Sequence, residues 1–198
     1  MTFGYSDLGE IEQDLELAKS LLAEAGYPDG FDTKIVTTER YQNGIELAEI
    51  ISQQLAEIGI NAEIEVWEWS ALSASWNGIT ADEFDQPIFI MGAGPSMRDA
   101  DGGLRGLYTT SETGLNDRNY GFYSNAEVDA LIEQGMQETD QQKRVEIYKE
   151  AMEILYREDP VAFWLFDMYG LAITSSKVEG VTLSPISTIT FENATVKK

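Results

Sequence analysis

The residues of this chain that could do chemistry are almost all carboxylates. The sequence has 35 Asp and Glu residues, and it has no histidine and no cysteine. The lack of histidine removes the usual general base, and the lack of cysteine removes thiolate nucleophiles, disulfides and most structural zinc sites. Among so many carboxylates, Asp/Glu pairs arise by chance, so no pair indicates glycoside hydrolysis. A carboxylate-dependent hydrolase is therefore the weakest of the functions considered below, and we expect the protein not to be an enzyme.

Two short motifs begin like ligand-binding loops but do not complete them. Asp99-Ala100-Asp101-Gly102 starts like a calcium loop, which would continue with Asp or Asn and then Gly, whereas the chain has Gly103-Leu104. Gly92-Ala93-Gly94 lacks the third glycine and the following helix of a dinucleotide-binding loop. It is typical of a strand end whose backbone stays bare. A looser oxygen site for a hard cation stays open, but we predict no metal and no cofactor.

Three of the four tryptophans, Trp67, Trp69 and Trp76, lie close together in the sequence. Core packing is one interpretation of each of them. A large aromatic side chain beside a strand end also suits the wall of a ligand site or a surface for a protein partner.

The pattern of apolar residues predicts the elements that would position these groups. A strand, a helix and a strand with short joints predict a βαβ unit with parallel strands. Gly92 to Tyr120 has little periodicity, so we expect a long irregular segment there. In chain order, we predict a helix over 11–25, a strand over 33–38, a helix over 48–58, a strand over 62–66, a short helix within 67–76, a strand over 87–91, a helix capped by Ser124, Asn125 or both, a helix capped by Asp140, and apolar strands at 161–166 and 171–174.

The charge of the chain argues against several classes of partner. Thirteen Lys and Arg against 35 Asp and Glu give a formal charge of −22. This charge repels a phosphate backbone and an anionic membrane surface, so we predict no binding to nucleic acid. The sequence contains no run of about 18 apolar residues, the length that a membrane-spanning helix needs. The first ten residues lack the basic and apolar regions of a signal peptide.

Four stretches in sequence order resemble one known family. They read LAKSLLAEAGYPDGF at 17–31, EIISQQLAEIGINAEI at 49–64 and FYSNAEVDALI at 122–132, followed by a helix and Glu-Asp-Pro-Val within 139–161. The chain resembles the C-terminal lobe of the family 5 extracellular solute-binding proteins of ABC importers, the oligopeptide, dipeptide and nickel group. The resemblance implies an α/β, periplasmic-binding-protein-like lobe (type II, cluster C) with a βαβ core and helices packed on a mixed sheet.

The resemblance also implies partners and a location. Residues 1–180 would form the ligand-binding lobe, and residues 181–198 would be a tail that returns to an N-terminal lobe, which with its export signal would precede Met1. The expected function is capture of a small solute, a short peptide or peptide-like molecule, for delivery to an ABC permease. The expected location is the extracellular face of the membrane or the periplasm. The alternative is a stand-alone acidic module that binds a protein partner through the surface around residues 67–76.

The site residues come from the same resemblance. In the family, the stretch that corresponds to Met91–Asp101 faces the ligand, and its backbone pairs with an extended ligand like an added strand. This predicts ligand contacts from Trp69, Gly92, Ala93, Gly94, Ser96, Arg98 and Asp99. The chain departs from the family in having Ala93 where tryptophan is frequent and Ser96 where peptide binders place an aspartate for the free amine. Arg98 could pair with a ligand carboxylate.

Overall fold

The computed structural model describes residues 3–77, 79–85, 88–92, 98–111, 119–166, 170–184 and 188–197. These residues form two compact units. One unit, made of residues 8–93 and 111–122, contains the parallel sheet and is called the sheet unit. The other, made of residues 1–7, 94–110 and 123–198, is called the helical unit. The elements are α1 (Leu15–Glu24), β1 (Asp32–Thr37), α2 (Gly44–Ala56), β2 (Asn61–Val66), α3 (Trp69–Ser75), η1 (Ala81–Glu83), β3 (Ile88–Phe89), α4 (Ala100–Tyr108), α5 (Ala126–Gln137), α6 (Gln141–Glu153), η2 (Ile154–Glu158), β4 (Val178–Glu179), β5 (Thr182–Leu183), β6 (Ile189–Thr190) and β7 (Thr195–Val196).

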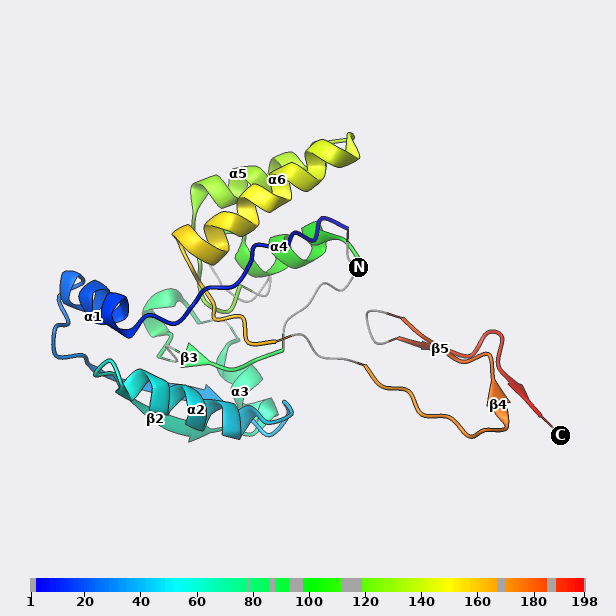
Figure 1. Cartoon of the computed structure of the whole chain (residues 1–198), viewed down its shortest axis with the longest axis horizontal. Helices are drawn as coiled ribbons and strands as arrows, with labels where there is room; N and C mark the ends of the chain where they lie inside the picture. Colours follow the sequence, from blue (N-terminus) through cyan, green and yellow to red (C-terminus); the bar gives the residue numbers. More distant parts are fainter. Residues whose placement is uncertain are drawn as a thin grey trace. The chain divides into compact units, whose positions relative to one another are not determined.

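The sheet unit is built on the predicted βαβ arrangement. Strands β1, β2 and β3 form a sheet in the order β2-β1-β3, and both pairings are parallel. Figure 1 shows α2 lying along the sheet, where Ala48 packs with Ile35 and Ala62. Val36 faces the other way, toward Leu72 and Trp76. Because the central strand β1 is covered on both faces, Ile35 and Val36 are both fully buried.

The helical unit packs three helices around one buried tyrosine. α4, α5 and α6 surround Tyr148, which is fully buried, and α5 and α6 run side by side in Figure 1. The predicted caps begin these helices. Asn125 accepts hydrogen bonds from the backbone of Glu127 and Val128, and Asp140 does the same at the start of α6. The end of α6 widens into a single π-helical turn, η2.

Apart from shifts in the ends of elements, the structure differs from the sequence predictions in three places. Gly92–Tyr120 is not irregular throughout, because α4 occupies 100–108 and buries Leu104 and Tyr108 one turn apart. Gly102 and Gly103 hide this helix in the sequence, since they weaken its intrinsic propensity. The stretches 161–166 and 171–174 form no strand, because no neighbouring strand pairs with their backbone in the described residues. The sheet of the sheet unit is wholly parallel rather than mixed, and the antiparallel pairs lie in a separate segment.

That separate segment is the end of the chain. Strand β4 pairs with β7, and β5 pairs with β6 between them, so one antiparallel strand pair is nested within the other. The described residues from 170 to 197 are called the C-terminal arm. Several of its large apolar side chains are exposed, with Leu171 and Ile173 more than four-fifths exposed. An isolated two-stranded hairpin of this size is marginally stable at best in water.

Candidate functional site

The carboxyl ends of the parallel strands carry the best candidate site. After β1 come Arg40 and Tyr41, after β2 comes Trp69, and after β3 comes Gly92. Open parallel sheets bind ligands at this edge, because the loops that follow neighbouring strands meet there. These residues and the buried Trp76, which packs against Trp69, are together called the strand-end cluster. Trp69 and Gly92 are two of the predicted ligand contacts.

Aromatic contacts hold the strand-end cluster together. The Trp69 ring meets Tyr41 edge-on at 5.8 Å between centroids, and it meets Trp76 edge-on at 5.9 Å. Trp76 is almost fully buried and packs on Phe89 at 5.5 Å, which fixes the cluster to the sheet. A Cβ placed on Gly92 would lie 3.2 Å from Cε1 of Tyr41. The bare backbone of Gly92 therefore allows the Tyr41 ring to approach it closely.

Arg40 supplies the charge of the cluster. Its guanidinium carbon lies 4.6 Å from the centroid of the Trp69 ring, in a cation–π contact. Arg40 is exposed, and among the described residues no carboxylate pairs with it. In a chain with 35 acidic residues, an arginine stacked in this way keeps its donors available. A guanidinium of this kind can bind a carboxylate through two parallel hydrogen bonds.

The loop and the helix that position these groups are fixed by local hydrogen bonds. The Thr37 hydroxyl donates to the carbonyl of Gly44 at 3.0 Å, and the Arg40 amide donates to Oγ1 of Thr38 at 3.3 Å. On the other side, the Glu68 carboxylate caps α3 by accepting from the amides of Ser70 (2.8 Å) and Ala71. Hydrogen bonds from Ser70 and these amides lower the pKa of Glu68, so the cap is ionised at neutral pH.

Trp67 has a structural role beside the cluster. Its indole N–H donates to Oε2 of Glu65 at 3.0 Å, and Lys34 lies 3.6 Å from the same carboxylate and 3.1 Å from Asp85. With Trp76 buried and Trp67 fixed to the sheet in this way, Trp69 is the tryptophan of the three best placed to meet a ligand.

The five remaining predicted site residues fall into two groups. Ala93, Gly94 and Ser96 lie outside the described residues. Arg98 and Asp99 belong to the helical unit, at the start of α4. The Arg98 side chain is exposed, and its carbonyl accepts a hydrogen bond from the Phe3 amide at 3.0 Å.

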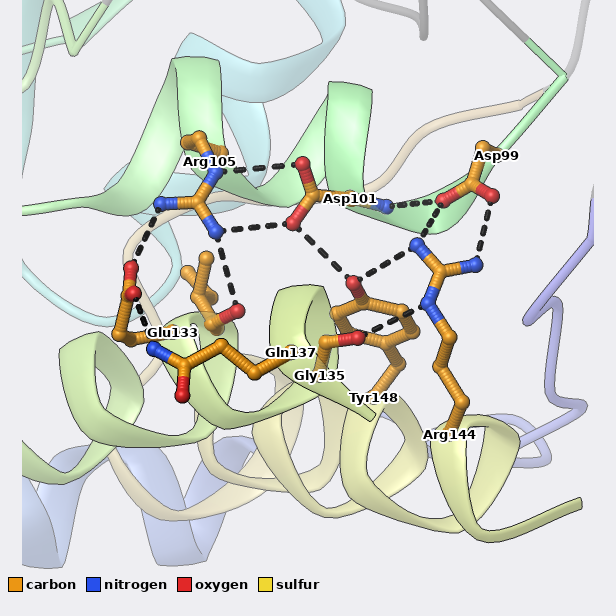
Figure 2. Close-up of polar contacts among 9 residues, drawn as sticks. Asp99, Asp101, Arg105, Glu133, Gly135, Gln137, Arg144 and Tyr148 are labelled. Carbon is orange, nitrogen blue, oxygen red and sulfur yellow. Dashed lines mark hydrogen bonds and ion pairs between the residues drawn. The ribbon is translucent and has the colours of Figure 1, made fainter. Parts of the chain in front are cut away.

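Asp99 is part of a network of charged and polar groups (Figure 2). Its two carboxylate oxygens accept from the Arg144 guanidinium at 2.7 and 2.9 Å, and one of them also caps α4 through the Asp101 amide. The Arg144 hydrogen bond lowers the pKa of Asp99. Asp101 in turn accepts from Arg105 and from the hydroxyl of Tyr148. The oxygens that suggested a loose cation site are therefore bound by protein donors.

Two functional candidates, Arg40 and Tyr41, were missed from the sequence. The available signal was their position, three and four residues beyond the first strand of a βαβ unit, at the edge where ligands bind. The described residues contain no group of three or more acidic side chains arranged to hold a metal ion. No helix in the described ranges has both the length and the apolar character needed to cross a bilayer.

Comparison with known proteins agrees with this architecture. The chain is 30% identical over 182 residues to the glutathione-binding protein GsiB of Salmonella choleraesuis, covering 91% of this chain and 35% of that protein. It is similar to the periplasmic binding protein DppA of Helicobacter pylori in complex with the peptide STSA (TM-score 0.66, 31% identity, 80% of this chain and 30% of that one). It is also similar to HbpA2 of Haemophilus parasuis (TM-score 0.73, 26% identity, 99% of this chain and 38% of that one).

The chain thus spans about a third of the length of these relatives. Residues 2–114 match the family described as bacterial extracellular solute-binding proteins, family 5, Middle. This match covers more than half of the sequence, and the parallel sheet and the strand-end cluster lie within it. The chain therefore belongs to the family 5 bacterial extracellular solute-binding proteins.

Proposed function

We propose that this chain is the C-terminal lobe of a solute-binding protein that captures a short peptide or peptide-like molecule with a free carboxylate and delivers it to an ABC permease. The binding is reversible, and the chain performs no chemistry on the solute. The observation that carries this proposal is Arg40, exposed and stacked on Trp69 at the ligand-binding edge of a parallel sheet. The GsiB and DppA relatives, which bind glutathione and the peptide STSA, support this class of solute.

Each group of site residues has its own role in binding the ligand. The Arg40 guanidinium binds the ligand carboxylate, and Trp69 with Tyr41 covers an apolar side chain of the ligand. Backbone groups of Gly92, Ala93 and Gly94 pair with an extended ligand, as an added strand would. Ser96, Arg98 and Asp99 complete the ligand-facing stretch. Asp99 would contribute through the backbone or through its position, since Arg144 and the Asp101 amide already use its carboxylate.

A companion lobe would complete the site. Two lobes that close on a ligand remove it from water, and one lobe alone leaves the ligand half solvated. The exposed apolar side chains of the C-terminal arm, which includes most of the predicted tail 181–198, supply a surface for that lobe to cover. Solute capture for a permease places the protein on the extracellular face of the membrane or in the periplasm.

Changing Arg40 to methionine is the variant that tests this function. In a longer protein that joins this chain to the proposed companion lobe, Arg40→Met is expected to weaken binding of glutathione or the dipeptide Met-Leu by roughly 10- to 100-fold, because a charge-assisted hydrogen-bond pair is worth about 1.5–3 kcal/mol. Isothermal titration calorimetry measures the dissociation constants. Methionine keeps much of the side-chain volume, so loss of packing contributes little.

A matched control is available elsewhere on the chain. Arg157 also lies over an aromatic ring, that of Tyr156 at 5.3 Å, but it lies in the helical unit, within η2. Arg157→Met is expected to leave the dissociation constant unchanged. Equal affinity for the parent protein and its Arg40→Met variant, with a solute that binds the parent, would show that Arg40 is not the carboxylate anchor.

A further inference from the structure

One guanidinium in the helical unit joins segments that are far apart in the sequence. Arg144 uses four of its N–H donors, two on the Asp99 carboxylate, one on the carbonyl of Gly135 at 2.8 Å and one on the hydroxyl of Tyr148 at 3.0 Å (Figure 2). Its guanidinium carbon also lies 5.0 Å from the centroid of the Phe3 ring. Arg144 on α6 therefore contacts the start of α4, the helix α5 and the beginning of the chain.

The beginning of the chain is tied to the start of α4 by backbone bonds as well. The Phe3 amide donates to the carbonyl of Arg98 at 3.0 Å, and the Ala100 amide donates to the carbonyl of Phe3 at 2.9 Å, in a short parallel bridge. Gly4 follows with a φ of +81°, and a Cβ there would lie 2.7 Å from Cβ of Ala100. The two segments are thus packed as closely as a glycine allows.

These two segments are also the ends of connections between the compact units. The chain passes from one unit to the other four times, between residues 7 and 8, 93 and 94, 110 and 111, and 122 and 123. Phe3–Gly4 lies just before the first of these passages, and Arg98–Ala100 lies just after the second. Neither segment is held to the rest of the helical unit by strand pairing beyond the bridge in the described residues.

We propose that Arg144 is a positioning residue that, through Asp99, clasps the ends of the first two of these four connections, so that its loss releases residues 3–4 and the start of α4 together while the helical core stays folded. The pair is well placed for this role. Its side chains are only 19% (Arg144) and 32% (Asp99) exposed, which limits screening by water. The groups that face the Asp99 carboxylate are the Arg144 guanidinium and the Asp101 amide, and those that face Arg144 are Asp99, Tyr148 and the Phe3 ring.

The clasp also has an expected effect on ligand binding, because Asp99 lies at the end of the predicted ligand-facing stretch from Gly92 to Asp99. This expectation rests on the proposed function. The clasp fixes the far end of this predicted ligand-facing stretch without contacting a ligand. Arg144→Met in the longer protein is then expected to weaken glutathione binding several-fold. If the parent protein bound no solute, the proposed function would be wrong. The clasp would not be affected by that result, because its own test uses no ligand.

Residue-resolved hydrogen exchange by NMR on the 198-residue chain tests the clasp directly. The reporter amides are those of Phe3, Ala100 and Asp101, whose acceptors belong to the clasped segments. In Arg144→Met, these amides are expected to exchange at least about tenfold faster, while the amides inside α5 and α6 keep their protection. Asp99→Asn removes the charge at constant size and is expected to give the same pattern. The acceleration of exchange in Asp99→Asn should be largest above the ordinary aspartate pKa of 3.8. It should fade at lower pH, where Asp99 of the parent chain also becomes protonated.

Arg105→Met is the control, because Arg105 belongs to the same network but contacts Asp101, Glu133 and the carbonyl of Ile132 instead. It is expected to leave the reporter amides of Phe3 and Ala100 unchanged. If Arg144→Met unfolds the unit, Arg144→Lys, which keeps the charge and loses the planar fork, is expected to accelerate only the reporters. Unchanged reporters in both Arg144 variants, or equal acceleration in Arg105→Met, would overturn the proposal.

Discussion

Replacing Tyr148 by alanine is expected to lower the free energy of unfolding of the helical unit by about 3–5 kcal/mol. The ring is fully buried between α4, α5 and α6, and its hydroxyl accepts from Arg144 and donates to Asp101. Burial is the main reason why the pKa of Tyr148 rises to about 12. The substitution removes the largest fully buried side chain and leaves a cavity that the helices cannot fill. Urea denaturation followed by circular dichroism measures the loss.

Two further variants separate packing from hydrogen bonding at this position. Tyr148→Phe keeps the ring and removes the hydroxyl, so it is expected to cost about 1 kcal/mol. Tyr27→Ala removes a ring that is half exposed and is expected to change the free energy of unfolding by about 0.5 kcal/mol or less. Equal destabilisation by Tyr148→Ala and Tyr27→Ala would mean that Tyr148 is not the centre of the core.

Gly30→Ala is expected to destabilise the sheet unit by about 2–4 kcal/mol. Gly30 has a φ of +76°, and a Cβ there would lie 1.9 Å from the carbonyl oxygen of Gly59. This contact is between two backbones, so no side-chain rotation can relieve it. The close approach lies just before β1 and β2, where the Asn61 amide donates to the carbonyl of Phe31 at 3.0 Å. An added methyl group would push the two strands apart where their pairing begins.

Gly26→Ala provides a matched control in the same turn. Gly26 also has a positive φ, +94°, but a Cβ there would meet nothing within 4 Å. This variant is expected to cost about 1 kcal/mol, the backbone penalty alone. Thermal denaturation of both variants measures the difference. A cost for Gly30→Ala no greater than that for Gly26→Ala would show that the approach to Gly59 does not constrain the strands.

The sheet unit was largely predictable from the sequence because its signals are local. The structure confirms the predicted βαβ arrangement. The predicted helical face of Ala48, Ile51 and Leu55 packs with Ala62 and Ile64 of the second strand, which is parallel to the first. Asp140 caps its helix as predicted, and of the two predicted candidates Ser124 and Asn125, the N-cap is Asn125. The first helix begins at Leu15 rather than at 11, because Asp14 caps it by accepting from the amide of Leu17.

The tertiary contacts of the site were less accessible to sequence reasoning. Whether an arginine is paired depends on which of 35 carboxylates the fold brings near it. Arg40 lies on an aromatic ring, whereas Arg144 reaches Asp99 across 45 positions. Helix α4 was missed for a related reason, because its packing against α5 is a tertiary contact, whereas Gly102 and Gly103 lower its intrinsic helix propensity.

A thermal-shift measurement on the longer protein that joins this chain to the proposed companion lobe tests the central claim most directly. Peptides, glutathione, nickel chelates and oligosaccharides would each be added at high concentration. The account predicts that a peptide-like solute at about 100 times its dissociation constant stabilises the protein by roughly 2.7 kcal/mol. It also predicts that the shift disappears in Arg40→Met and Trp69→Ala, and that the 198-residue chain alone responds weakly. The account would be contradicted if no solute class shifted the longer protein while the 198-residue chain by itself bound a protein partner.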